Sequence, residues 1–281
     1  MEKELDAKRQ LCELKLTHNA NNNYTLEGCT PQLVRPLPLS IAVGDPFSYA
    51  AKVIEKEIKR AGLRFQGKIL PGKAPSKADT ITRFLSEPLP TYLERMLKKS
   101  DNQVADSLLK TMGNKWINKG TLGSNFPGNF ANGTAAVREA IETHTGIALG
   151  NAYIADGSGL SRFNLLNAEI LSSLIAHIGA LSDKTLYNAL AISGVDGSLK
   201  YRRGLINKPL AGKIHAKSGY LRGIYNLAGF LENNRGELIQ FAVTVDGFNL
   251  APGVPDWKKT PKWKHPIRRF YEEFFEALYY L

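Results

Sequence analysis

Three short polar motifs stand in order along the chain and carry the residue types that serine-based acyl transfer needs. They are Ser100-Asp101-Asn102, Asp156-Gly157-Ser158-Gly159 and Lys217-Ser218-Gly219. A serine hydroxyl is a weak nucleophile until a neighbouring group takes its proton, and a lysine can serve as that neighbour. Each motif alone is a weak signal, because such tripeptides usually cap helices or end strands. Their order and wide separation indicate one composite site.

The elements that must position these motifs follow from the hydrophobic spacing. We expect Ser100 and Asp101 to separate a helix over 92–99 from a helix over 102–112 that stops at Gly113. Further helices are expected over 46–61, 134–145, 168–178, 184–190 and 267–279, and strands over 63–70, 151–155, 213–217, 223–231 and 237–246. Helices followed by an antiparallel meander and a last helix predict an α/β (α+β) domain, with a sheet covered by helices.

Taken together, the motifs resemble the C-terminal part of the class C low-molecular-mass penicillin-binding proteins, which are periplasmic D-alanyl-D-alanine carboxypeptidases and endopeptidases. The resemblance runs from about Gln10 to the end, and its segments are Pro36–Leu39, Met96–Asn102, Ile154–Arg162, Asp196–Leu199, Lys217–Gly219 and Tyr225–Phe230. It implies a β-lactamase-like antiparallel sheet covered by helices, in a transpeptidase-like catalytic domain over residues 83–281. Residues 1–82 would be the C-terminal part of an inserted, β-rich domain.

The resemblance also implies roles for single residues in cleaving D-alanyl bonds of peptidoglycan stem peptides through an acyl-serine. Ser100 would relay a proton to the leaving amine, Asn102 would bind the substrate amide, and Lys217 would supply a fixed positive charge. The substrate-binding residues implied are Asp101, Asp156, Ser158, Ser218, Gly219 and Tyr220. Among these, Ser218 would hold the substrate carboxylate, and the backbone N–H of Tyr220 would be one oxyanion donor.

Two positions of this site depart from the family's pattern. The family commonly has Thr where this chain has Ser218, and Ser keeps the hydroxyl, so little is lost. The family commonly has Ser where this chain has Tyr220, so a bulkier ring puts substrate choice in question more than chemistry. The loop at Asp156 also has a second interpretation, because glycines permit tight turns and an aspartate caps them. By that interpretation the loop is structural and takes no direct part in catalysis.

The nucleophile motif of this family, Ser-x-x-Lys, has one match here, Ser107-Leu108-Leu109-Lys110. This match lies on the same expected helix as Asn102, about 10 Å further along the axis than Ser100 at 1.5 Å per residue. We therefore expect Ser107 not to be the nucleophile. The chain then resembles an enzyme of this family that lacks its N-terminal part. A split or frameshifted gene, a mis-assigned start or a deliberate truncation would each produce such a chain. Such a chain would be inactive alone, or would be completed by a separate N-terminal chain.

The two cysteines bear on the compartment. Cys12 and Cys29 flank a strand–turn–strand pattern, so they could form a hairpin disulfide or stay as two free structural thiols. The family has a cysteine pair at this place, which implies the disulfide and a periplasmic location. By contrast, the first residues hold no apolar segment of a secretory signal peptide.

Composition limits the function classes. With 281 residues, 43% hydrophobic and 22% charged, the chain can bury a core, which excludes wholesale disorder. Its uncharged stretches are too short for a transmembrane helix. The net charge of +11 is compatible with an acidic partner, but no nucleic-acid motif accompanies it, so we expect no nucleic-acid partner. We expect no metal and no organic cofactor.

Two functions of different class remain open. The first is the serine peptidase, which would bind peptidoglycan stem peptides and β-lactams. The second is a non-catalytic remnant that binds peptidoglycan or a partner chain without turnover. Covalent labelling by a β-lactam separates them, because it requires a nucleophilic serine. The basic and aromatic segment 258–279 likewise has two interpretations, a helix packed on the sheet or a helix on a membrane surface.

Overall fold

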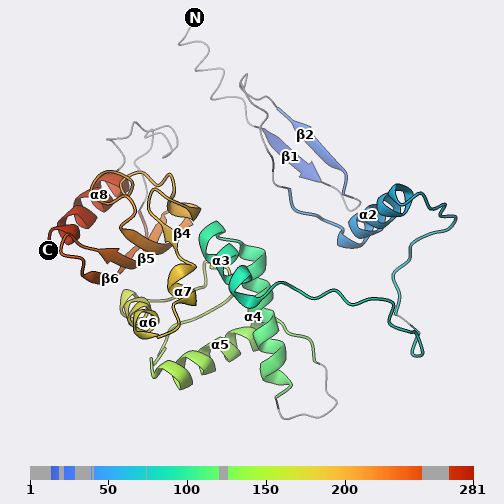
Figure 1. Cartoon of the computed structure of the whole chain (residues 1–281), viewed down its shortest axis with the longest axis horizontal. Coiled ribbons are helices and arrows are strands. Elements are labelled where there is room, and N and C mark those ends of the chain that lie inside the picture. Colours follow the sequence, from blue (N-terminus) through green and yellow to red (C-terminus); the bar gives the residue numbers. More distant parts are fainter. Residues whose placement is uncertain are drawn as a thin grey trace, which may run out of the picture. The chain divides into compact units, whose positions relative to one another are not determined.

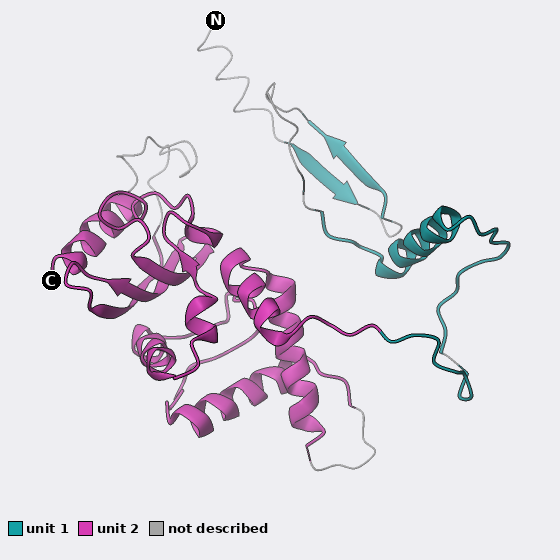
Figure 2. Cartoon of the chain, in the orientation of Figure 1, with its two compact units in different colours: residues 1–83 teal, residues 84–281 magenta. Residues whose placement is uncertain are grey.

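The computed structural model describes residues 14–18, 22–28, 39, 41–73, 75–119, 126–248 and 266–281. The chain divides into two compact units, residues 1–83 and 84–281 (Figure 2). The division falls beside the expected boundary, after residue 82. Cys12 and Cys29 lie outside the described residues, as does the basic segment before the last helix, so the disulfide stays a prediction.

Unit 1 contains a β-hairpin and a helix. Strands β1 (Lys15–His18) and β2 (Tyr24–Glu27) pair antiparallel, and α2 (Pro46–Arg60) begins where Asp45 accepts a hydrogen bond from the Ser48 N–H at 3.0 Å. Among the described residues of this unit, no side chain is buried. The strand expected over 63–70 was wrong: this stretch is irregular and its Leu70 is 74% exposed, so its apolar residues have no sheet to pack on.

Unit 2 is built on a four-stranded antiparallel sheet with helices on both faces (Figure 1). The strands run in the order β3 (Ala191–Ile192), β4 (Ile214–Leu221), β5 (Ile224–Glu232) and β6 (Leu238–Val245). On one face Leu227 packs with Phe275 of helix α8 (Pro266–Tyr279), and on the other Phe230 packs with Ile175 of helix α6 (Ala168–Ala180). The predicted α+β architecture of a helix-covered antiparallel sheet is confirmed.

The remaining helices of unit 2 are α3 (Leu89–Lys99), α4 (Asn102–Ile117), α5 (Phe130–Thr145), the short α7 (Thr185–Asn188) and the 3-10 helix η1 (Gly197–Leu199). The expected end of α4 at Gly113 was wrong. A Cβ at Gly113 would lie 2.2 Å from Asn132 Oδ1, so this glycine lets α4 and α5 pack closely instead of ending α4. Helix α5 begins at Phe130 rather than at 134, because Asn129 and Asn132 form a reciprocal capping box.

Two smaller features complete the described fold. The strand expected over 151–155 was also wrong, because only Tyr153 pairs, with Leu165, in an isolated bridge. Within the part of the chain that the structure describes, no helix is long and apolar enough to cross a bilayer.

Candidate active site

The structure brings Ser100 and Lys217 together from opposite parts of unit 2. Lys217 Nζ donates a hydrogen bond to Ser100 Oγ at 2.8 Å and another to the Ser218 carbonyl at 2.7 Å. Ser100 ends α3 with φ 56° and ψ 49°, a left-handed conformation that residues other than glycine rarely adopt. Strained backbone of this kind is typical of functional sites, and here it turns the chain sharply between α3 and α4.

The other two residues of this motif start α4. Asp101 accepts a hydrogen bond from the Val104 N–H at 3.1 Å and pairs with Arg95 at 2.7 Å. The bond from Arg95, and then that from Val104, hold the pKa of Asp101 below its usual range. Its oxygens therefore fix the α3–α4 junction, and the expected contact of Asp101 with substrate stays a prediction. Asn102 is exposed at the first position of α4.

Lys217 lies in the middle of β4 and is half-buried. Burial lowers its pKa, and the positive charge of Arg202 lowers it further. An ammonium that loses its proton more easily than an ordinary lysine, held against a serine hydroxyl, can take part in proton transfer. The pair thus has the geometry expected for a proton relay through Ser100, with Lys217 holding the hydroxyl.

Beside this pair, one edge of β4 extends past the described strand β3. The described part of β3 pairs only with His215 and Ala216, so Lys217–Leu221 has no strand on that side among the described residues. Ile214 directs both its N–H and its carbonyl toward Ser193, on the β3 side. Because peptide groups alternate along a strand, the N–H of Tyr220 points to this same edge. That orientation suits a backbone donor to a bound carbonyl.

The side chains after Lys217 lie in distinct surroundings. Ser218 Oγ is 3.1 Å from Ser198 Oγ of η1, and Gly219 lies opposite Asn226 of β5. The Tyr220 ring is 49% exposed and meets Tyr225 edge-on, with ring centres 5.1 Å apart. Ser198 is a residue to which the sequence assigned no role, although it belongs to the Asp-Gly-Ser-Leu segment over 196–199.

The Gly-rich loop is held on α4 by a residue that the sequence analysis missed. Asp106 Oδ1 accepts hydrogen bonds from the N–H groups of Gly157 at 3.0 Å and Ser158 at 2.9 Å. Asp106 follows Asn102 by one helical turn, so both side chains lie on the same face of the predicted helix. This carboxylate beside the predicted site was the signal that could have identified Asp106 from the sequence. Asp156 itself accepts from the N–H groups of Gly159 and Ser161, both at 2.7 Å. These contacts account for Asp156 as a loop-forming residue, and its role toward substrate stays a prediction.

The Ser158 side chain has a different environment. Its hydroxyl oxygen is buried and has no hydrogen-bond partner within the described ranges. The substrate contact expected for Ser158 therefore stays a prediction as well.

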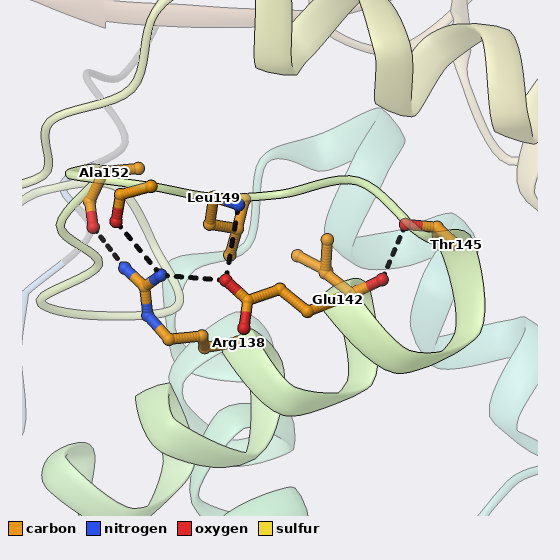
Figure 3. Close-up of polar contacts among 7 residues, drawn as sticks. Arg138, Glu142, Thr145, Leu149 and Ala152 are labelled. Atoms are coloured by element: carbon orange, nitrogen blue, oxygen red, sulfur yellow. Dashed lines mark hydrogen bonds and ion pairs between the residues drawn. The ribbon is translucent and has the colours of Figure 1, made fainter.

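The segment that leads into this loop is anchored on α5 (Figure 3). Arg138 donates hydrogen bonds to the carbonyls of Gly150 and Ala152, and it pairs with Glu142 at 3.1 Å. Glu142 in turn accepts from the N–H of Leu149 at 3.3 Å. The path of the chain into the Gly-rich loop is thus set by two side chains of one helix.

The alternative serine, Ser107, lacks the environment of a nucleophile. The Lys110 ammonium lies over the Phe130 ring, 4.2 Å from its centre, and the Ser107 carbonyl accepts from the Thr111 hydroxyl. No hydrogen bond joins Ser107 to Lys110 within the described ranges. The expectation that this match is not the catalytic Ser-x-x-Lys motif is consistent with these contacts.

A cavity of about 970 Å³ lies apart from the Ser100–Lys217 pair. The 146–152 and 164–173 stretches line it, together with Asn226 and Thr244 of the sheet face that also carries Lys217. Within the described residues, no three His, Cys, Asp or Glu side chains lie close enough together to hold a metal ion.

Comparison with known proteins finds relatives over most of this chain. The model of the D-Ala-D-Ala carboxypeptidase 3 (S13) family matches residues 2–261. The chain is 36% identical over 266 residues to the D-alanyl-D-alanine carboxypeptidase DacB of Haemophilus influenzae, covering 94% of this chain and 54% of that protein. It is 27% identical over 236 residues to the D-alanyl-D-alanine carboxypeptidase of an Actinomadura species, covering 80% of this chain and 41% of the relative.

A solved structure gives the same result. The crystal structure of penicillin binding protein 4 (dacB) from Haemophilus influenzae, complexed with a β-lactam, matches with a TM-score of 0.80 at 36% identity. The match covers 98% of this chain and 61% of that one. The chain spans about half the length of the curated relatives it matches. By the extent of the family match and the identity to its members, the chain belongs to the D-Ala-D-Ala carboxypeptidase 3 (S13) family.

Proposed function

We propose that this chain carries the Ser-x-Asn and Lys-Ser-Gly parts of a serine-type D-alanyl-D-alanine carboxypeptidase/endopeptidase site that acts on peptidoglycan stem peptides. The observation that carries the proposal is the 2.8 Å hydrogen bond from Lys217 Nζ to Ser100 Oγ. It joins two motifs that lie far apart in the sequence, in a chain of a carboxypeptidase family.

The proposed reaction runs in two steps. A serine hydroxyl attacks the carbonyl of the penultimate D-alanine, so that a C–O bond forms and the C–N bond to the last D-alanine breaks. The proton from the attacking hydroxyl passes to the leaving amine through Ser100, with Lys217 holding that hydroxyl in place. Water then hydrolyses the ester, which releases the shortened peptide and returns the serine.

Substrate binding is proposed at the edge of β4. Ser218 would hold the substrate's C-terminal carboxylate and Lys217 would supply the nearby positive charge. The outward-facing N–H of Tyr220 would stabilise the oxyanion, a role that in other acyl-transfer sites contributes about 2.7–4 kcal/mol to the barrier. Asn102, exposed at the start of α4, would bind the substrate amide.

The nucleophile is proposed to come from polypeptide outside these 281 residues. The single Ser-x-x-Lys match has its lysine placed over an aromatic ring. The relatives extend well beyond the matched region, with 54% of the Haemophilus protein covered. We place the working enzyme in the periplasm, and we expect β-lactams as ligands because a family neighbour was crystallised with one.

A fluorescent penicillin tests this function. In one sample the purified chain alone is incubated with the penicillin. In a parallel sample the chain is first co-expressed with the part of the Haemophilus DacB that it does not match. We expect no label on the chain alone, and label on the added polypeptide in the complex, which Lys217→Ala abolishes. Label that peptide mapping assigns to Ser107, and that Ser107→Ala removes, would overturn the assignment of the nucleophile. Absence of label in a formed complex would favour the non-catalytic binding function.

A further inference from the structure

The segment over 196–199 has no role in the proposed chemistry, yet it touches both parts of the chain that carry the Ser100–Lys217 pair. Asp196 pairs with Lys98 of α3, with Nζ and Oδ2 2.8 Å apart. Two residues later, Ser198 Oγ lies 3.1 Å from Ser218 Oγ, next to Lys217. One short segment therefore connects the end of α3 with the middle of β4.

The Lys98–Asp196 ion pair is less exposed to solvent than an ordinary surface ion pair. The Lys98 and Asp196 side chains are 18% and 32% exposed, and Asp196 Oδ1 also accepts from the Ile192 N–H at 2.9 Å. Burial raises the pKa of Asp196, but the bonds from Lys98 and Ile192 outweigh burial and hold it below its usual value. The carboxylate is thus fixed on the β3 side of the sheet and offers one oxygen to α3.

The backbones also approach closely at this point. Gly197 has φ +56°, and a Cβ there would lie 2.7 Å from the carbonyl oxygen of Lys98. Lys98 stands in the last turn of α3, two residues before Ser100 and its left-handed backbone. Side chain and backbone of residues 196–197 together therefore hold the turn that aims the Ser100 hydroxyl.

We propose that Asp196 is a positioning residue: through its ion pair with Lys98 it fixes the end of α3, so that Ser100 Oγ stays within hydrogen-bond reach of Lys217 Nζ. The inference rests on the proposed function only in treating Ser100 and Lys217 as the working pair. A merely stabilising ion pair would raise the resistance of the fold to denaturant and leave the Ser100–Lys217 bond unchanged.

The test reads the pKa of Lys217 in the full chain labelled with ¹³C-lysine, its resonance identified by its loss in Lys217→Arg. Asp196→Asn keeps an oxygen for the Ile192 N–H but removes the charge that ties Lys98 to residues outside α3, while the pairing of Lys98 with Glu94 of its own helix, 3.1 Å away, stays. We expect it to lower the pKa of Lys217 by about half a pH unit or more, because the ammonium loses the Ser100 acceptor. Ser100→Ala should lower the pKa of Lys217 likewise. In the double variant of Asp196→Asn and Ser100→Ala, Lys217 should have the same pKa as in Ser100→Ala alone.

Two further variants keep the test decisive. Lys98→Gln removes the other end of the pair and should reproduce the effect of Asp196→Asn. Glu232→Gln is the matched control, because Glu232 pairs with Lys213 at the other end of β4 and should leave the pKa of Lys217 unchanged. An unchanged pKa in folded Asp196→Asn, or a shift that persists in full when Ser100 is alanine, would overturn the inference. This readout needs neither nucleophile nor substrate, so it is independent of penicillin labelling.

Discussion

Units 1 and 2 both contain regular helices, but different forces hold them. Helix α2 in unit 1 and helix α6 in unit 2 each begin with a side-chain cap, from Asp45 and Asn167. Among the described residues, only α6 of these two helices reaches a core, where its Ile175 packs with the fully buried Phe230. In α2 the apolar side chains Phe47 and Ile54 stay 41% and 47% exposed.

The comparison shows what a chemically demanding site requires. Local capping and amphipathic spacing form a helix in either unit, but a single helix of this length is marginal in water. A hydrogen bond such as that between Lys217 and Ser100 needs groups held to within a few tenths of an ångström. Every predicted catalytic residue accordingly lies in unit 2, where burial fixes the elements.

The largest expected difference between the units comes from truncating one aromatic residue in each. Phe275→Ala removes a fully buried ring that meets Phe241 edge-on at 4.7 Å, and we expect it to lower the free energy of unfolding by about 3–5 kcal/mol. Phe47→Ala, on α2, should cost less than about 1 kcal/mol. Urea unfolding followed by circular dichroism measures both. Equal losses would mean that unit 1 has a core comparable to that of unit 2.

A pair of aspartates sharpens the comparison. Asp106 holds the Gly-rich loop from 51 and 52 residues away, whereas Asp45 caps its own helix. We expect Asp106→Ala to cost about 1.5–3 kcal/mol and to speed amide exchange at Gly157 and Ser158. The control, Asp45→Ala, should affect only the start of α2. Hydrogen exchange by mass spectrometry separates the two, and unchanged protection of the loop would contradict the role given to Asp106.

Two glycines with positive φ make the next comparison. Gly197 and Gly62 have φ of +56° and +75°, so alanine is strained at both, but only at Gly197 does a new Cβ meet backbone. We expect Gly197→Ala to lower stability by about 1–3 kcal/mol more than Gly62→Ala, through overpacking. Thermal unfolding of the two variants measures the difference. If both lose the same stability, the close contact of η1 with α3 does not constrain the fold.

The smallest expected effect concerns pH. Burial lowers the pKa of Lys217, so the folded state holds its proton less tightly than the unfolded state does. The resulting penalty is complete below the folded pKa and disappears as pH rises from the folded pKa toward 10.5. Lys217→Met should therefore gain stability relative to wild type at pH 7, and the gain should shrink at higher pH. The matched variant is Lys213→Met. Because the hydrogen bond to Glu232 raises the pKa of Lys213, this variant should show no such gain.

Much of this protein could be predicted from residues close in sequence. Asp45 and Pro46 predicted the start of α2, spacing of three and four predicted α8, and the strands expected over 223–231 and 237–246 correspond to β5 and β6. The strand expected over 213–217 was too short, because β4 continues four residues further, to Leu221, where it pairs with β5. The motifs around Ser100 and Lys217 pointed to one site, and the structure joins these two residues. Such signals succeed because caps, turns and periodicity act within a few residues of each other.

Other features depended on contacts between residues far apart in sequence. Gly113 looked like a helix end, yet it lies inside α4, where a side chain would collide with α5. Apolar residues over 63–70 looked like a strand but have no sheet to join. The hold of Asp106 on the Gly-rich loop and the pairing of Lys98 with Asp196 likewise arise only when distant segments meet. Local signals in the sequence were enough to predict most of the elements and the motifs of the candidate site, whereas tertiary packing set where those elements end and how the site is held, because long-range contacts override local preference.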